Sequence, residues 1–210
     1  MKSYGKLTAT LLVAWFLFAL IAGAFGLFSN AAARIAAGVG LAAGIPLVLF
    51  FLWIAFSPNF RQFTLSLNPR ILTYAQTWRL LGVVFVILEA RGALPAIFAL
   101  PAGYGDMFIG ATAAFAAFTL ATPNHRAAFI TWQFLGILDL VSAVTLGITA
   151  PIINPSAASM IPMTILPLSL IPTFLVPVFL ILHAISIAQA TGWPAKPAAA
   201  INAATTRQPA

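Results

Sequence analysis

The chain has 210 residues, of which 62% are apolar and only 6% are charged. A soluble domain carries roughly a quarter charged residues, so this composition excludes an ordinary soluble protein and indicates one multi-pass membrane domain. The net charge of +7 comes from ten Lys and Arg residues against three acids. These bases stand singly between apolar runs, which is typical of the cytoplasmic ends of membrane helices and argues against a nucleic-acid-binding surface.

The first two apolar runs predict helices over residues 8–28 and 31–56. No charge interrupts the run from Leu7 to Ala33. That is long for the core of a signal peptide, so we expect the first helix to be retained. The second helix carries small residues four apart, which would let another helix, a membrane partner or a second copy approach closely. This stripe consists of Ala32, Ala36, Gly40 and Gly44.

A proline after an asparagine marks the start of the third helix. Asn68 can cap a helix and Pro69 suits its first position, so we expect a helix over residues 69–91 that Gly92 stops. The short segment before it, residues 60–67, is expected at the membrane interface. Residues 94–100 are too few to span a bilayer, which indicates an interfacial or re-entrant piece before a fourth helix over residues 104–121.

The last two helices are predicted over residues 127–148 and 164–190. The final helix contains Pro167, Pro172 and Pro177, which predict repeated bends because proline interrupts the helical hydrogen bonds. Residues 194–210 are small and polar, so we expect them to form a disordered cytoplasmic tail.

The placement of charges predicts the orientation of this all-α bundle of six transmembrane helices, which makes up residues 1–193. With the N-terminus in the cytoplasm, only Arg34 and Arg91 fall outside and Arg79 lies within a helix. Basic residues prefer the cytoplasmic side, so both termini are expected there. The bases on that side are Lys2, Lys6, Arg61, Arg70, Arg126, Lys196 and Arg207.

Two ionisable residues of opposite charge are predicted at matching depth in the bilayer. Arg79 is ten residues and Asp139 is twelve residues from the inner end of its helix. At about 1.5 Å per residue, both lie roughly 15–18 Å deep. Each alone would be costly in hydrocarbon, so we expect an Arg79–Asp139 ion pair. The pair serves either as structural glue or as a gate, proton relay or counter-ion.

Other polar residues suggest two further features. Gln76, Gln133 and His183 could form a polar path from the pair towards the cytoplasm, or could satisfy one another. A second cluster is expected at the outer mouth, where helix three ends and helix four begins, and where backbone amides attract anions. It comprises Glu89, Arg91, Tyr104 and Asp106.

The sequence offers little for metal or cofactor chemistry. It has no cysteine, and its two histidines, His125 and His183, fall at different depths, which argues against a bis-histidine haem. No HExxH, GxSxG or phosphate-binding loop occurs. We therefore expect no metal, no cofactor and no catalytic residue.

Three segments resemble a pattern in uncharacterised bacterial multi-pass membrane proteins: QTWR at residues 76–79, LPAIFALPAGYGD at 94–106 and GILDLVSAVTLG at 136–147. The resemblance implies the bacterial inner membrane and marks Arg79, Asp106 and Asp139 for testing. It implies no activity.

The residues favour a structural or accessory role, as a subunit of a larger membrane complex. Few polar residues and several small-residue faces suit packing better than chemistry. The alternative is a small transporter or channel at Arg79, Asp139 and His183. A membrane enzyme acting on lipid comes third, and its candidate groups would be Glu89, Tyr104 and Asp106.

Overall fold

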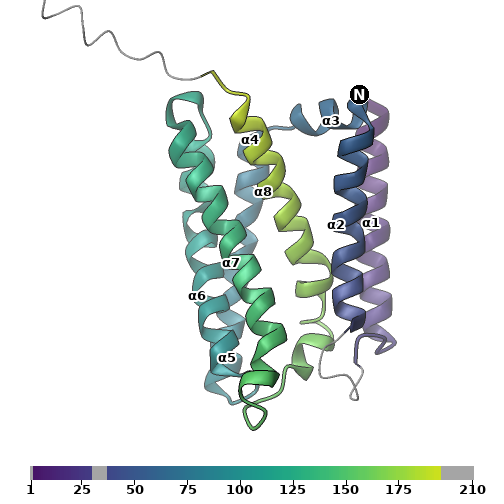
Figure 1. Ribbon diagram of the computed structural model, residues 1–210, viewed down its shortest axis with the longest axis vertical. Coiled ribbons are helices and arrows are strands. Elements are labelled where there is room, and N and C mark those ends of the chain that lie inside the picture. The colour runs from purple at the N-terminus through teal and green to yellow at the C-terminus, as the bar shows by residue number, and fades with distance from the viewer. Residues whose placement is uncertain (1, 30–36, 195–210) are drawn as a thin grey trace, which may run out of the picture.

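The computed structural model describes residues 2–29 and 37–194, which form helices and no strand. Long helices stand side by side in a bundle, and α3 lies across one end (Figure 1). The first turn of α1 and the last turn of α8 lie at that same end. The α-helices are α1 (Lys2–Ala24), α2 (Ala37–Phe56), α3 (Pro58–Leu65), α4 (Pro69–Tyr74), α5 (Val83–Ala90), α6 (Ala96–Phe115), α7 (Arg126–Ile153) and α8 (Val176–Thr191).

Shorter helical turns join or extend these helices. A tight 3-10 stretch, η1 (Ala75–Gly82), links α4 to α5, so that residues 69–90 form one continuous helix. Wider π-turns extend α6 at η2 (Ala116–Leu120) and precede α8 at η5 (Ile171–Leu175). Two 3-10 turns, η3 (Pro123–His125) and η4 (Ile161–Thr164), lie in the connections.

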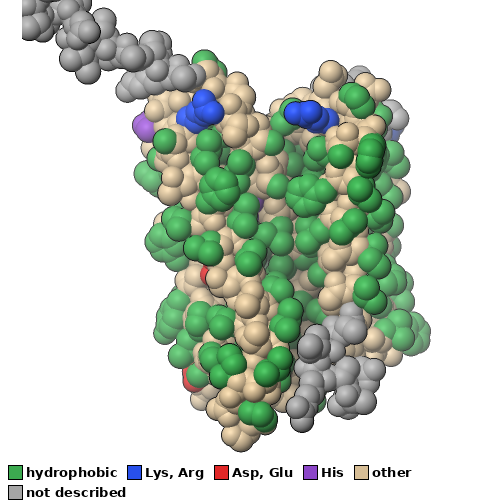
Figure 2. All heavy atoms as spheres, viewed as in Figure 1, with side chains coloured by type: hydrophobic (Ala, Val, Ile, Leu, Met, Phe, Trp, Pro, Cys, Tyr) green, Lys and Arg blue, Asp and Glu red, His purple; other side chains and the backbone are tan. Residues whose placement is uncertain are grey.

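Five helical stretches are long and apolar enough to cross a membrane. This confirms the prediction of an all-α chain that is compatible with a membrane. The helix α6, which carries Asp106, is not among the five. Figure 2 shows Lys and Arg side chains at the end that holds α3, with hydrophobic side chains covering much of the visible surface below them. The five stretches are Tyr4–Ala24, Gly38–Phe56, Pro69–Ala90, Pro123–Ile153 and Ile171–Thr191.

The first helix begins earlier and ends earlier than the sequence predicted. It covers Lys2–Ala24, and Gly26 follows it with a positive φ of 68°. Only glycine adopts that conformation readily, so the helix stops before residue 28. The start predicted for the second helix, residues 31–36, lies outside the described residues.

Capping side chains fix both ends of the link between α2 and α4. The Ser57 hydroxyl accepts a hydrogen bond from the Phe60 amide at the start of α3. Asn68 Oδ1 accepts one from the Arg70 amide at 2.9 Å, with Pro69 at the first helical position. The prediction of a helix start at Asn68-Pro69 is confirmed, because the side chain satisfies a free backbone amide there.

The fourth helix differs most from the prediction. No separate interfacial piece occupies residues 94–100, because α6 starts at Ala96 and runs through Pro101. The chain turns at Gly92, whose φ is 69°, and Ala93 donates back to the Leu88 carbonyl. This glycine turn places the chain directly into the next helix.

Apolar packing explains why α6 continues through its proline. Pro101 removes one helical hydrogen bond. Residues on both sides of it, Phe98, Ala99 and Ala102, are buried in a core with Phe85 of α5. Burial of these side chains compensates for the missing bond.

The last helix starts later than predicted. The helical stretch begins near Leu170, and α8 itself begins at Val176. Pro172 therefore lies at the start of the stretch, where a missing amide is tolerated, whereas Pro177 lies where η5 passes into α8. Pro177 deprives the Thr173 carbonyl of its usual helical donor, and the Trp15 indole of α1 donates to that carbonyl at 3.1 Å.

Candidate functional site

The centre of the bundle holds a charged cluster around Arg79. Arg79 lies on η1 and is only 2% exposed. Its Nε donates to Asp106 Oδ1 of α6 at 2.7 Å, and its Nη2 donates to Asp139 Oδ2 of α7. Nη1 donates to the Gly136 carbonyl at 3.2 Å. One guanidinium therefore joins three helices of the bundle through charge-assisted hydrogen bonds.

A fourth helix enters the cluster through His183 of α8. Arg79 Nη1 lies 3.3 Å from His183 Nε2, and the other ring nitrogen, Nδ1, faces Gln133 Oε1. Because a guanidinium only donates, Nε2 must be the acceptor and Nδ1 must carry the proton. Gln133 then donates to Thr73 Oγ1 at 3.0 Å. A continuous hydrogen-bonded chain thus runs from both aspartates through Arg79 to Thr73 of α4.

Glycines bring the helix backbones close to these side chains. A Cβ at Gly105 would lie 1.6 Å from Asp139 Oδ1, and one at Gly136 would lie 2.3 Å from the His183 ring. A Cβ at Gly82 would meet the Asp106 side chain at 2.4 Å. No larger residue fits at these positions without displacing the charged or imidazole group. The glycines therefore define the space that the cluster occupies.

A small cavity adjoins the cluster. Its volume is about 30 Å³, and its walls include Arg79 and Asp106 together with residues of α5, α7, η5 and α8. Most of its walls are apolar, and Arg79 and Asp106 are its charged groups, so the cavity has room for about one water molecule beside them. The side chains of Asp106 and Asp139 keep 13% and 14% of their surface exposed, whereas that of Arg79 keeps 1%. The carboxylates are thus the accessible side of the cluster.

The three residues predicted as a polar path are all buried. Gln76 donates to the Phe179 carbonyl of α8 at 3.4 Å, while Gln133 and His183 bond to each other. Further along α8, Ser186 and Gln189 lie on the side of the helix that carries His183 and are also buried. Gln189 donates to three backbone carbonyls at the end of α3. Buried polar groups therefore extend from the cluster to the end of the bundle that holds α3.

The structure does not bring the four residues of the predicted outer-mouth cluster together. Asp106 bonds to Arg79 in the bundle centre, so its assignment to an outer mouth is corrected. Tyr104 is 59% exposed, and neither Glu89 nor Arg91 forms an ion pair within the described part of the chain. The physical reason is the early start of α6, which moves Asp106 ten residues into the helix, about 15 Å from its start.

Sequence reasoning found Arg79 and Asp139 but missed Asp106 as their partner. The sequence predicted a separate short piece over residues 94–100, closed at Pro101, and a helix start at residue 104, which placed Asp106 in the first turn of that helix at the outer mouth. The apolar spacing of Phe98, Ala102 and Ile109 on both sides of the proline was the available indication of a longer helix.

The described residues contain no group of three or more His, Asp or Glu side chains that could hold a metal ion. His125 lies away from the cluster, in the loop before α7, where its Nδ1 is 3.1 Å from Thr122 Oγ1. The two described residues of the small-residue stripe have open space around them. A Cβ at Gly40 or Gly44 would meet nothing within 4 Å, and Ala32 and Ala36 lie outside the described residues.

The chain matches one protein-family model. The family model described as a domain of unknown function, DUF8737, matches residues 36–191, which include every helix that contributes to the cluster. No curated protein and no solved structure matches the chain. The chain belongs to the DUF8737 family.

Proposed function

We propose that this protein is a small proton-coupled transporter or proton pathway in which the Arg79 cluster binds and releases one proton. The observation that carries the proposal is the composition of the cluster: two carboxylates from different helices share one guanidinium. Intramembrane ionisable residues are rare and usually serve ion pathways or proton relays.

Charge balance supports a proton as the ligand. With Arg79 charged, His183 neutral and both aspartates ionised, the cluster carries one negative charge. A net charge in hydrocarbon is costly, whereas the same cluster with one added proton is neutral. The cavity beside Asp106 has room for about one water molecule, which suits a proton better than a larger substrate.

The arrangement of polar groups supports a route on one side of the cluster. From His183 the hydrogen-bonded chain continues through Gln133 to Thr73 of α4, and α4 lies towards the end that holds α3 (Figure 1). Hydroxyl and imidazole side chains, with intervening water, can relay a proton over a short distance, whereas the Gln133 amide positions its neighbours. Opening of a second route would require movement of η5 and α8, whose residues form part of the cavity wall.

The proposal is tested by charge displacement on a solid-supported membrane. The purified chain is reconstituted in liposomes, and a rapid pH jump is applied without any other substrate. We expect a protein-dependent current transient that Asp139→Asn or Asp106→Asn abolishes. Glu89→Gln is the matched control, because Glu89 is the third acid of the chain and makes no contact with the cluster. Transients of equal size in wild type and both aspartate variants would contradict the proposal.

A structural or accessory role is the second candidate, and the packing of α2 favours it. No residue in the apolar window of α2 is buried within the chain, and Gly40 and Gly44 have open space above them. Such a surface suits lipid or a close helix–helix contact with a partner subunit or a second copy. Co-purification of a stoichiometric membrane protein in mild detergent, and its loss in Gly44→Leu, is the result expected for this role.

The same features support a proposal for the orientation. We propose that six helices span the membrane, namely the five apolar stretches together with α6. We further propose that both termini lie in the cytoplasm and that the protein resides in the bacterial inner membrane. The shared end of α1 and α8 and the basic side chains at that end support this orientation. The idea of an enzyme acting on lipid loses its geometric basis, because Asp106 bonds to Arg79 and does not share a pocket with Glu89 and Tyr104.

A further inference from the structure

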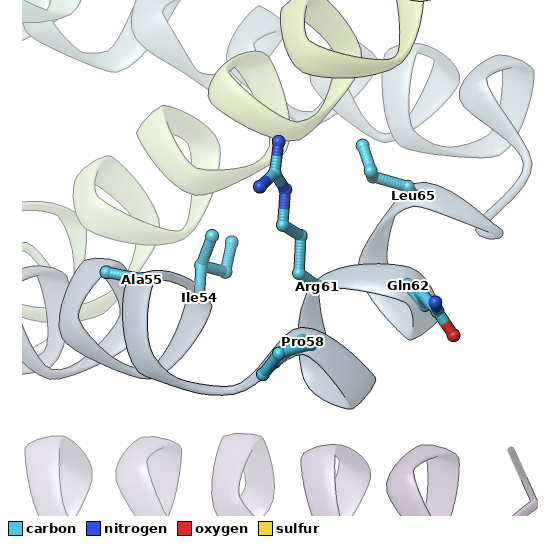
Figure 3. Close-up of a pocket in the computed structure, with 6 residues that line it drawn as sticks. All are labelled: Ile54, Ala55, Pro58, Arg61, Gln62 and Leu65. Atoms are coloured by element: carbon cyan, nitrogen blue, oxygen red, sulfur yellow. The ribbon is translucent and has the colours of Figure 1, made fainter.

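A second, larger pocket lies at the basic end of the bundle, away from the Arg79 cluster. Its volume is about 310 Å³, and it is formed where α2 ends and α3 turns across the bundle. Figure 3 shows the side chain of Arg61 extending from α3 into the space between Ile54 and Leu65. The full lining is Ile54, Ala55, Pro58, Arg61, Gln62 and Leu65.

The opposite face of α3 holds this helix in place. Phe60 is 1% exposed and stacks on Trp53 of α2 with ring centroids 3.8 Å apart. Thr64 is buried as well, and Gln189 of α8 donates to carbonyls at the end of the helix. The pocket side carries Pro58, Arg61, Gln62 and Leu65, a spacing that places them on one face of α3. These contacts anchor α3, which forms one wall of the pocket.

The charge in the pocket has no acidic partner in the chain. Arg61 is exposed, and the sequence has only three acidic side chains. Asp106 and Asp139 pair with Arg79 in the bundle centre. Glu89 lies near the end of α5, at the opposite end of the bundle from α3 (Figure 1). An anion that binds Arg61 must therefore come from outside the protein's side chains.

The remaining walls indicate what kind of anion fits. Ile54, Ala55 and Leu65 are apolar, and the pocket adjoins α2, whose apolar window is entirely unburied within the chain. A free phosphate would leave these apolar walls unused, whereas a lipid supplies a phosphate and a hydrocarbon chain together. Basic pockets beside membrane helices on the cytoplasmic side commonly bind anionic headgroups.

We propose that this pocket binds an anionic phospholipid. Arg61 binds the headgroup phosphate, Gln62 supplies a further polar group, and an acyl chain lies along the apolar end of α2. The site differs from the Arg79 cluster in location and ligand, so it does not depend on the proposed proton function.

The test is native mass spectrometry of the full chain in mild detergent, titrated with phosphatidylglycerol and, separately, with zwitterionic phosphatidylcholine. We expect the first phosphatidylglycerol to bind more tightly than phosphatidylcholine. Arg61→Gln should weaken that binding about five- to tenfold, in line with the loss of one basic contact to an anionic lipid. Arg70→Gln is the matched control, because Arg70 is also exposed near this end and does not line the pocket.

A second variant separates the pocket from general surface charge. Ala55→Phe keeps the charge and fills part of the pocket, so it should also weaken phosphatidylglycerol binding. Equal losses in Arg61→Gln and Arg70→Gln, with no loss in Ala55→Phe, would show diffuse charge attraction and overturn the proposal. Displacement of the lipid by millimolar inorganic phosphate alone would show a free-anion site and would also overturn it.

Discussion

Different interactions stabilise two parts of the bundle: the helices α4 to α8, and the pair α1 and α2. The helices α4 to α8 surround a charged cluster, and the buried share of the apolar windows in stretches 69–90, 123–153 and 171–191 is 33%, 22% and 33%. The pair α1 and α2 has 17% and 0% of the corresponding residues buried, and aromatic side chains make many of its contacts. The first part is thus built around a polar site, whereas the second presents a largely apolar surface.

This difference indicates where function resides. In apolar helices without a polar site, one residue can replace another as long as the helix stays apolar and still packs. The cluster instead requires a particular residue at each contact, down to the glycines that leave space for Asp139 and His183. Changes in the two parts should therefore have very different consequences, and the following variants test that contrast.

The largest effect is expected from removing the central charge. Arg79→Ala leaves Asp106 and Asp139 without their shared partner, which should cost about 3–5 kcal/mol of unfolding free energy. The Arg79→Ala/Asp139→Ala double variant should lose less than Arg79→Ala alone. Unfolding in mixed micelles of dodecyl maltoside and dodecyl sulfate measures both. Arg70→Ala, at an exposed base, serves as the control. A loss in Arg79→Ala as small as that in Arg70→Ala would contradict the account.

The next effect comes from adding a single methyl group. Gly136→Ala places a Cβ against the His183 ring and should cost about 1–3 kcal/mol through overpacking. Gly40→Ala makes the same chemical change on α2, where a Cβ meets nothing within 4 Å, and should be neutral or slightly stabilising. The same unfolding assay compares them. Similar losses for both glycines would remove the contrast between the two parts.

A smaller effect is expected where the two parts meet at α3. Gln189→Leu removes the donor to the carbonyls of Thr64, Leu65 and Leu67, and should cost about 1–2 kcal/mol. Hydrogen exchange should accelerate in α3 and remain unchanged around Arg79. Faster exchange throughout the bundle would show that α3 is not an independently anchored element.

The smallest effect is expected at the contact between α1 and η5. Trp15→Phe keeps an aromatic ring near Phe174 but removes the donor to the Thr173 carbonyl, which should cost about 1 kcal/mol. Phe18→Leu, at a side chain that is 56% exposed, is the control. Protease sensitivity of the first helix provides the readout, and equal sensitivity in the two variants would argue against an anchoring role for Trp15.

The sequence alone predicted those features that depend on composition or on the residues of a single helix. The apolar runs predict the helical, membrane-compatible fold, and Asn68-Pro69 predicts the start of α4. Matching depth alone suggested the meeting of Arg79 and Asp139. The role of Asp106 required the start of α6, and Pro101 concealed it. The contacts of His183 and the space beside Gly136 depend on how four helices pack, which no local pattern encodes.

The central claim is that the aspartates of the Arg79 cluster bind one exchangeable proton. Infrared difference spectroscopy of the reconstituted protein tests it most directly. Spectra recorded before and after a pH change should contain a protonated-carboxyl band that Asp106→Asn or Asp139→Asn removes and Glu89→Gln leaves in place. A band that survives in both aspartate variants and disappears only in Glu89→Gln would contradict the claim.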